Sequence, residues 1–166
     1  MNKKNIALIG MPGCGKSTVG KLLAEKLNYP LADIDQLIEA AAKKSIPQIF
    51  AEDGEEIFRK LETHALSGQA AKTGTVIAAG GGIVTRTENL PLLKQNSIII
   101  YLKRRLEELE TKNRPLSGSV GIETLAKQRL PLYEMWSDYT VDVEENPGKT
   151  VNRILEKIEI SGSREK

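Results

Sequence analysis

IALIGMPGCGKST, residues 6–18, joins a short apolar run to a loop with three glycines, a lysine and two adjacent hydroxyl side chains. Gly10, Gly15, Lys16 and Ser17 match the pattern G-x-x-x-x-G-K-[ST] in full, between a strand pattern and a helix pattern. Glycines let successive backbone N–H groups point at an anion, and the following helix adds the positive end of its dipole. The stretch predicts a loop that holds nucleotide phosphates, against the alternative of a chance glycine turn before a helix.

The residue types in this loop suit a triphosphate and a hard cation. Lys16 is expected to reach the outer phosphates, and the Ser17 hydroxyl is expected to ligate Mg²⁺. Cys14 is interpreted as a small side chain that fits the loop, with a thiol of lowered pKa as the alternative. The motif predicts the ligand class but leaves the second substrate and the reaction open.

Strand and helix patterns alternate along the rest of the chain. Strands are expected at residues 6–9, 31–34, 75–79, 97–102 and 139–143, and helices at 16–27, 54–71, 122–135 and 150–160. Most of the strands are continuous apolar runs, which are typical of a parallel sheet covered on both faces. The alternation predicts an α/β sandwich with right-handed crossovers, in which ligands bind at the carboxyl ends of the strands.

Composition limits the class of protein. The 166 residues fit a single domain, expected over residues 1–160, with residues 161–166 as a frayed tail. The chain has one cysteine, and no apolar run approaches the roughly 20 residues of a membrane span. The net charge of +2 and the small aromatic content of 4% argue against a nucleic-acid partner. We expect a cytoplasmic monomer that contacts neither a membrane nor a nucleic acid.

Two segments between these elements lack a clear pattern. Residues 112–121, KNRPLSGSVG, hold a proline, two glycines and two serines. They predict either a mobile lid or an ordinary surface loop. Residues 42–53 are expected to form an irregular connection that contains Pro47.

A pair of carboxylates follows the second strand. Asp33 and Asp35 are separated by one residue, so strand alternation would place both on one face. One could hold Mg²⁺ through water while the other takes the proton of an acceptor hydroxyl. Alternatively, Asp35 is a helix N-cap, because the segment QLIEAAAK that follows has a helical pattern.

Two further groups of residues have both a structural and a functional interpretation. Glu55, Arg59 and Glu62 share one helix face, which is usual for a solvated ladder of ion pairs and also suits a binding site. Gly80, Gly81 and Gly82 follow the strand TVIAA. They form either a flexible loop or a place where backbone N–H groups approach a ligand closely.

Other classes of phosphate-loop protein fit less well. Guanine-specific GTPases carry [NT]-K-x-D, whereas residues 111–114 read Thr-Lys-Asn-Arg and lack the carboxylate that reads the base. Transport and motor ATPases need longer chains. A small kinase remains, which requires a lid and an acceptor site.

The complete set of motifs closely resembles shikimate kinase. The matching pieces run in family order over nearly the whole chain: GMPGCGKS at 10–17, D-I-D at 33–35, F-x-x-x-G-E-x-x-F-R-x-x-E at 50–62, GGG at 80–82, Arg-Pro-Leu at 114–116, R-L-P-L-Y at 129–133 and Val-Asp…Asn-Pro at 141–147. The resemblance implies a five-stranded parallel sheet of the nucleoside-monophosphate-kinase type, with a mobile lid at about 112–121. It also implies phosphoryl transfer from ATP to the 3-hydroxyl of shikimate in aromatic amino acid biosynthesis.

The resemblance also implies roles for individual residues. ATP phosphates would lie against Gly13, Cys14, Gly15, Lys16, Ser17, Thr18 and Arg114. Mg²⁺ would lie at Ser17 and Asp33, and shikimate would lie at Asp35, Arg59, Gly80, Gly81, Gly82 and Arg129. Catalysis would fall to Lys16, Arg114 and Asp35, with Asp35 as the base.

This sequence departs from the family at the adenine side. The family's arginine ahead of the lid has no match, and Lys112 or Arg105 is the expected substitute. Glu145 stands in the expected adenine loop at 141–147, where many relatives carry a basic or neutral residue. Two other functions stay open: a kinase of another small polyol acid such as gluconate, and a nucleotide-binding regulatory module without turnover.

Overall fold

The computed structural model describes residues 3–109 and 121–164. In this part of the chain five strands form one parallel sheet in the order β2-β3-β1-β4-β5. The strands are β1 (Asn5–Ile9), β2 (Leu31–Asp33), β3 (Val76–Ala78), β4 (Ser97–Lys103) and β5 (Tyr139–Asp142). All five lie where the apolar runs predicted them, within one residue at each end.

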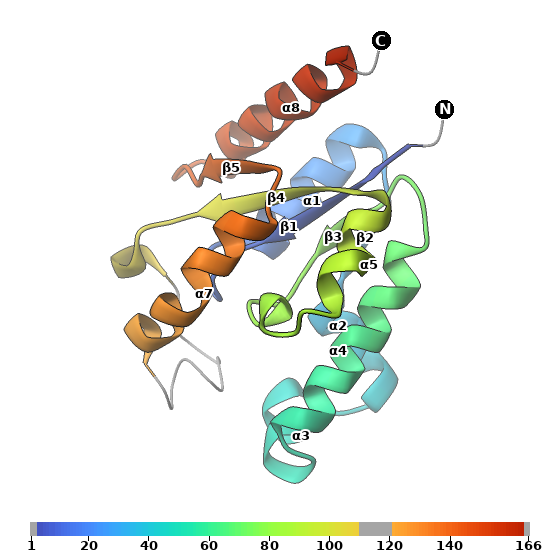
Figure 1. Ribbon diagram of the computed structural model, residues 1–166, viewed down its shortest axis with the longest axis vertical. Coiled ribbons are helices and arrows are strands. Elements are labelled where there is room, and N and C mark those ends of the chain that lie inside the picture. Colours follow the sequence, from blue (N-terminus) through green and yellow to red (C-terminus); the bar gives the residue numbers. More distant parts are fainter. Residues whose placement is uncertain (1–2, 110–120, 165–166) are drawn as a thin grey trace.

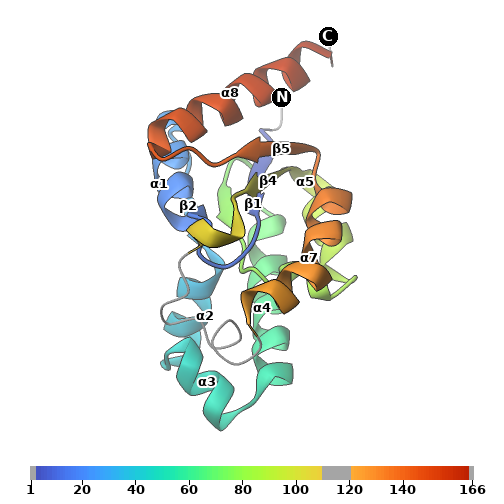
Figure 2. The same ribbon diagram turned by 90° about the vertical axis from the view of Figure 1, so that its left-hand side faces the viewer.

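Helices cover both faces of this sheet (Figures 1 and 2). They are α1 (Lys16–Leu27), α2 (Ile34–Ala42), α3 (Ile46–Glu52), α4 (Glu55–Ala70), α5 (Asn89–Asn96), α7 (Ile122–Trp136) and α8 (Pro147–Arg164), with 3₁₀ turns η1 (Ile83–Thr85) and η2 (Leu106–Glu108). Right-handed crossovers put α4, α5 and α7 on the face opposite α1 and α8. The contacts of α1 with α8 and of α4 with α5 agree with this three-layer arrangement.

The central strand explains why the phosphate loop is held firmly. Every residue of β1 is buried, because β3 and β4 flank it and helices cover both its faces. Leu8 pairs with Ala78 of β3 and with Ile100 of β4. Buried on all sides, β1 fixes the start of the loop at the carboxyl edge of the sheet.

Three elements differ from the sequence prediction. Residues 42–53 contain α3, whose N-cap Ser45 accepts a hydrogen bond from the Gln48 amide and whose Pro47 stands in the first turn, where its missing N–H costs nothing. α5 was not predicted. α8 begins at Pro147 and continues to Arg164, beyond the predicted end at residue 160 and into the segment predicted to be frayed.

The helices α2, α3 and α4 pack against one another and extend beyond the sheet (Figure 1). Packing against α2 and α3 holds α4 at the same edge of the sheet as the phosphate loop. The predicted lid, apart from Gly121, lies outside the described residues. No helix in residues 3–109 and 121–164 is long and apolar enough to span a membrane.

Candidate active site

The loop between β1 and α1 has the backbone of an anion site. The backbone φ angles of Gly10, Gly13 and Gly15 are 153°, 80° and 101°, values that residues other than glycine rarely adopt. Gly15 is the N-cap of α1 and supplies no side-chain hydrogen bond to the first turn. The N–H groups of that turn, together with the helix dipole, are therefore free to hold a phosphate.

Lys16 folds back across this loop. Its Nζ donates to the carbonyl oxygens of Gly10 at 2.8 Å and Met11 at 2.9 Å, and it also lies 3.7 Å from the Cys14 sulfur. The Cys14 side chain is completely buried. This position agrees with a small side chain that fits the loop. Lys16 places a cationic group beside the predicted phosphate site.

Ser17 and Asp33 form the pair predicted for Mg²⁺. The Ser17 hydroxyl donates to Asp33 Oδ2 at 2.7 Å, while Asp33 Oδ1 accepts the amide N–H of Gln36 at 3.2 Å. Asp33 is thus the N-cap of α2, the role that the sequence suggested for Asp35. No group of three or more His, Cys, Asp or Glu that could hold a metal is found in the described part of the chain. A hydroxyl and one carboxylate fit a Mg²⁺ that completes its shell with phosphates and waters.

A cavity of about 230 Å³ joins the phosphate loop to the second strand and the glycine run. The predicted residues that line it are Gly13, Gly15, Lys16, Ser17, Thr18, Asp33, Asp35, Gly80 and Gly81. Asp35 lies in the first turn of α2 rather than on the strand, but it opens onto the same cavity as Asp33. Both carboxylates therefore face the same cavity, as predicted. The reason is the turn from strand to helix between them, and not the alternation along a single strand that the sequence suggested.

The part of this cavity next to the expected adenine loop includes one residue that the sequence analysis missed. Arg104 lines the cavity, with Glu144, Glu145 and Pro147 from the loop after β5. Arg105, one of the two expected substitutes, has a side chain 80% exposed and pairs with Glu108. Arg104 directly follows the carboxyl end of β4, where ligands bind in such sheets. That position in the sequence could have identified it as a candidate site residue. Lys112 and Arg114 lie outside the described residues.

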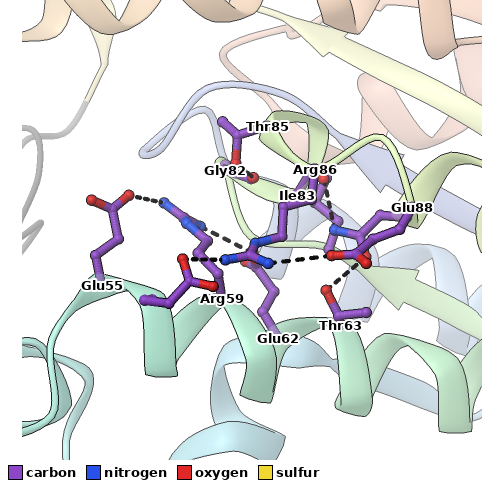
Figure 3. Close-up of polar contacts among 12 residues, drawn as sticks. Glu55, Arg59, Glu62, Thr63, Gly82, Ile83, Thr85, Arg86 and Glu88 are labelled. Atoms are coloured by element: carbon purple, nitrogen blue, oxygen red, sulfur yellow. Dashed lines mark hydrogen bonds and ion pairs between the residues drawn. The ribbon is translucent and has the colours of Figure 1, made fainter.

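Arg59 and Glu62 form a buried ion pair on α4 (Figure 3). Arg59 Nη1 lies 3.0 Å from Glu62 Oε1, and both side chains are at most 6% exposed. Arg59 Nη2 lies 3.4 Å from the exposed Glu55. The interpretation of this face as a solvated ladder of ion pairs is therefore wrong. Burying two charges is costly, so the pair indicates a site rather than a source of stability.

Arg129 of α7 supplies a second buried guanidinium. Its side chain is 3% exposed, and burial, followed by the nearby charge of Arg59, lowers the pKa of Arg129. Within residues 3–109 and 121–164, the buried Nε atoms of Arg59 and Arg129 and the buried Oε2 atom of Glu62 have no hydrogen-bond partner. Two buried cationic groups with unused donors favour an anionic ligand between them.

The glycine run fits closely around these groups. A Cβ on Gly80 would lie 2.6 Å from Glu62 Oε2 and 3.1 Å from Asp35 Oδ1, and one on Gly81 would lie 2.7 Å from the Pro12 ring. A Cβ on Gly82 would overlap the guanidinium of Arg59. The close approach of Pro12, Glu62 and Arg59 therefore leaves little space for side chains here, which favours the interpretation of a closely approached site over that of a flexible loop.

Glu62 gives the stability of the fold an unusual pH dependence. Burial raises the pKa of Glu62 above its ordinary value of 4.5, Arg59 offsets part of the rise and Asp35 adds to it. In the window between the unfolded and folded pKa values the folded protein binds more protons, so the free energy of unfolding falls as pH rises. We expect wild type to lose stability relative to Glu62→Gln as pH rises above 4.5.

Urea unfolding of both proteins at a series of pH values measures this difference. Glu56→Gln is the matched control, because Arg86 lowers the pKa of the exposed Glu56. Wild type should therefore gain stability over Glu56→Gln as pH rises through the acid range. If the free energy of unfolding of wild type changed with pH in parallel with that of Glu62→Gln, the raised pKa of Glu62 would be contradicted.

Comparisons with known proteins agree on one family. A family model described as shikimate kinase matches residues 12–159. A shikimate kinase from Dehalococcoides mccartyi is 41% identical over 167 residues, which cover 96% of this chain and 93% of that relative. One from Clostridium beijerinckii is 40% identical, with 94% and 95% covered. The structure of shikimate kinase from Acinetobacter baumannii in complex with shikimate is similar with a TM-score of 0.90, 35% identity, and 96% and 94% coverage.

Proposed function

The chain belongs to the shikimate kinase family, and we propose that its residues transfer the γ-phosphoryl group of ATP to the 3-hydroxyl of shikimate, giving shikimate 3-phosphate and ADP. One observation carries this assignment: the phosphate loop and Asp35 line one cavity, and two buried arginines lie beyond its glycine wall. Shikimate has a carboxylate and three hydroxyls. The carboxylate suits the arginines, and a hydroxyl suits Asp35.

The phosphate loop would hold the nucleotide. The N–H groups at Gly13–Thr18 would bind the phosphates, and Lys16 would leave the carbonyl oxygens of Gly10 and Met11 for the β and γ phosphates. Ser17 and Asp33 would hold Mg²⁺, which when bound draws charge from the phosphate oxygens. Phosphoryl transfer needs positioning and positive charge more than covalent chemistry, and these groups supply both.

Asp35 would act as the base. The shikimate 3-oxygen attacks the γ-phosphorus, the bond from that phosphorus to the bridging β–γ oxygen breaks, and the hydroxyl proton passes to Asp35. Arg59 and Arg129 would clamp the carboxylate with the planar fork of the guanidinium, and Gly80, Gly81 and Gly82 would close the site. A role for Arg114 at the ATP phosphates, and the lid that carries it, rest on the family resemblance.

Three further expectations from the sequence remain part of this proposal. We expect the protein to act in the cytoplasm, as a monomer, and as one kinase domain over residues 1–160. Of these, the single domain is supported by the one family model that matches residues 12–159.

Product analysis tests the proposed reaction. Incubation with ATP, Mg²⁺ and shikimate should give a product whose ³¹P signal correlates with the proton on carbon 3. The same mixture with excess EDTA should give none, because phosphoryl transfer from ATP needs Mg²⁺ on the phosphates. A phosphate on another carbon, or no phosphorylated shikimate, would contradict the proposed orientation or the reaction.

Gly82→Ala tests the position of the clamp. The added Cβ would lie 2.5 Å from Arg59 Cζ, so the guanidinium must move. We expect kcat/KM for shikimate to fall by about tenfold or more, while ADP affinity stays within about twofold, because a small misplacement of a binding group lowers the rate strongly.

Gly68→Ala is the matched control. It also replaces a glycine by alanine, but a Cβ there meets no atom within 4 Å. Steady-state kinetics should show Gly68→Ala equal to wild type. Unchanged shikimate kinetics in Gly82→Ala would mean that Arg59 does not hold the acceptor where the structure puts it.

A further inference from the structure

The hydroxyl of Tyr133 reaches from α7 to the glycine run. The side chain is fully buried, and its hydroxyl donates to the carbonyl oxygen of Gly81 at 2.5 Å, across 52 residues of sequence. In the sequence, Tyr133 stands out only as the last residue of the motif R-L-P-L-Y at 129–133. This contact connects that motif to the wall of the cavity.

We propose that Tyr133 is a positioning residue for the acceptor, whose hydroxyl holds Gly81 and Arg129 in place around the shikimate carboxylate. This inference rests on the proposed function, because it assumes that shikimate occupies the site behind the glycine run. Three independent contacts of the tyrosine support it.

The first contact completes the hydrogen bonding of the glycine run. The carbonyl oxygens of Gly80 and Gly82 accept N–H groups from Ile83 at 3.1 Å and Thr85 at 3.0 Å within the turn itself. The carbonyl between them accepts the Tyr133 hydroxyl instead. A hydrogen bond from another helix thus fixes the middle glycine, and the other side of Gly81 lies against Pro12 of the phosphate loop.

The second contact is with Arg129, one helical turn earlier on α7. The Tyr133 hydroxyl lies near enough to the Arg129 side chain to interact with it, and the interaction partly offsets the effect of burial on the pKa of each group. Positions i and i+4 of a helix face the same way, so one hydroxyl contacts both the clamp and the loop. Burial raises the pKa of Tyr133, which keeps the hydroxyl protonated and able to donate.

The third contact fixes the ring. Tyr133 stacks on Tyr101 of β4 with ring centroids 5.2 Å apart and 26° between the planes. The sheet therefore determines where the hydroxyl lies. Such support from neighbouring residues is what keeps a binding group within the small tolerance that catalysis needs.

Tyr133→Phe tests the inference, with Tyr101→Phe as the matched control. Tyr133→Phe keeps the ring but leaves the buried carbonyl of Gly81 without its donor and removes the hydroxyl beside Arg129. Tyr101→Phe removes a hydroxyl from the other ring of the same stack and leaves the bond to Gly81 intact. The wild-type protein is assayed first with shikimate, so that failure of the proposed reaction is recognised before the variants are compared.

We expect Tyr133→Phe to weaken shikimate binding, measured by calorimetry, by about fivefold or more and to lower kcat/KM at least as much. ADP affinity should stay within about twofold, and Tyr101→Phe should keep wild-type values. A purely structural role would instead lower the melting temperature with unchanged KM, or weaken both ligands alike. Either result, or shikimate binding within twofold of wild type, would overturn the inference.

Discussion

Replacing Asp35 by asparagine is expected to lower kcat with shikimate by about 10²- to 10⁴-fold, the usual contribution of a positioned base. The change keeps the size of the side chain but removes its negative charge and its capacity to take a proton. Asp35 lines the same cavity as Lys16 and Ser17, so its carboxylate opens onto the space that the proposed phosphate site shares. Asp33, not Asp35, caps α2, so the substitution does not remove the cap of that helix.

Asp53→Asn is the matched control for this prediction. Its carboxylate forms a surface ion pair with Lys44 away from the cavity, and such pairs contribute little. Single-turnover measurements with saturating ATP and shikimate separate chemistry from binding. A rate near wild type for Asp35→Asn would remove Asp35 from the role of base and leave it only as a ligand for the acceptor hydroxyls.

The second large effect is expected at Arg59. Arg59→Ala should lower kcat/KM for shikimate by about 30-fold or more, or about 2 kcal/mol, while ADP still binds. The reason is that one partner of a buried charged contact is removed, and Glu62 is also left without its ion pair. Arg59→Lys guards against a folding defect, because it keeps the charge and loses only the planar fork.

Arg86→Ala is the control for Arg59. Arg86 pairs with Glu88 (Figure 3) and with Glu56 of α4, but both of these carboxylates are exposed. In both Arg59 variants, kinetics should show a lower kcat/KM for shikimate, while calorimetry should show an unchanged affinity for ADP. Equal losses for ADP and shikimate would indicate a damaged fold, and no loss for shikimate would place its carboxylate elsewhere.

Much of the fold follows from local pattern. The strands are continuous apolar runs, and the G-x-x-x-x-G-K-[ST] loop fixes where the first helix begins, so these elements were predicted nearly to the residue. α3 was missed because Pro47 indicated a break, although proline is compatible with a first helical turn. α5 was missed because its helical pattern is weak, and the buried Asn89 holds its start by accepting from Thr63 and donating to Ile83.

The site was predictable in its residue types but not in its contacts. Local spacing placed Asp33 and Asp35 at a strand end, yet which of them caps the helix depends on side-chain direction. The burial of Arg59 and Glu62, and the contact between Tyr133 and Gly81, depend on packing between elements far apart in sequence. The hydrophobic periodicity of the sequence does not predict contacts between distant elements, so these contacts could be identified only from the structure.

The most direct test of the central claim is the rate of ADP release from ATP and Mg²⁺ with different acceptors. Shikimate, gluconate, a nucleoside monophosphate and no acceptor are compared at equal concentration. If the buried arginines and Asp35 form a shikimate site, release should be rapid with shikimate alone. Faster release with another acceptor, or tight ADP binding without turnover on any of them, would contradict the account.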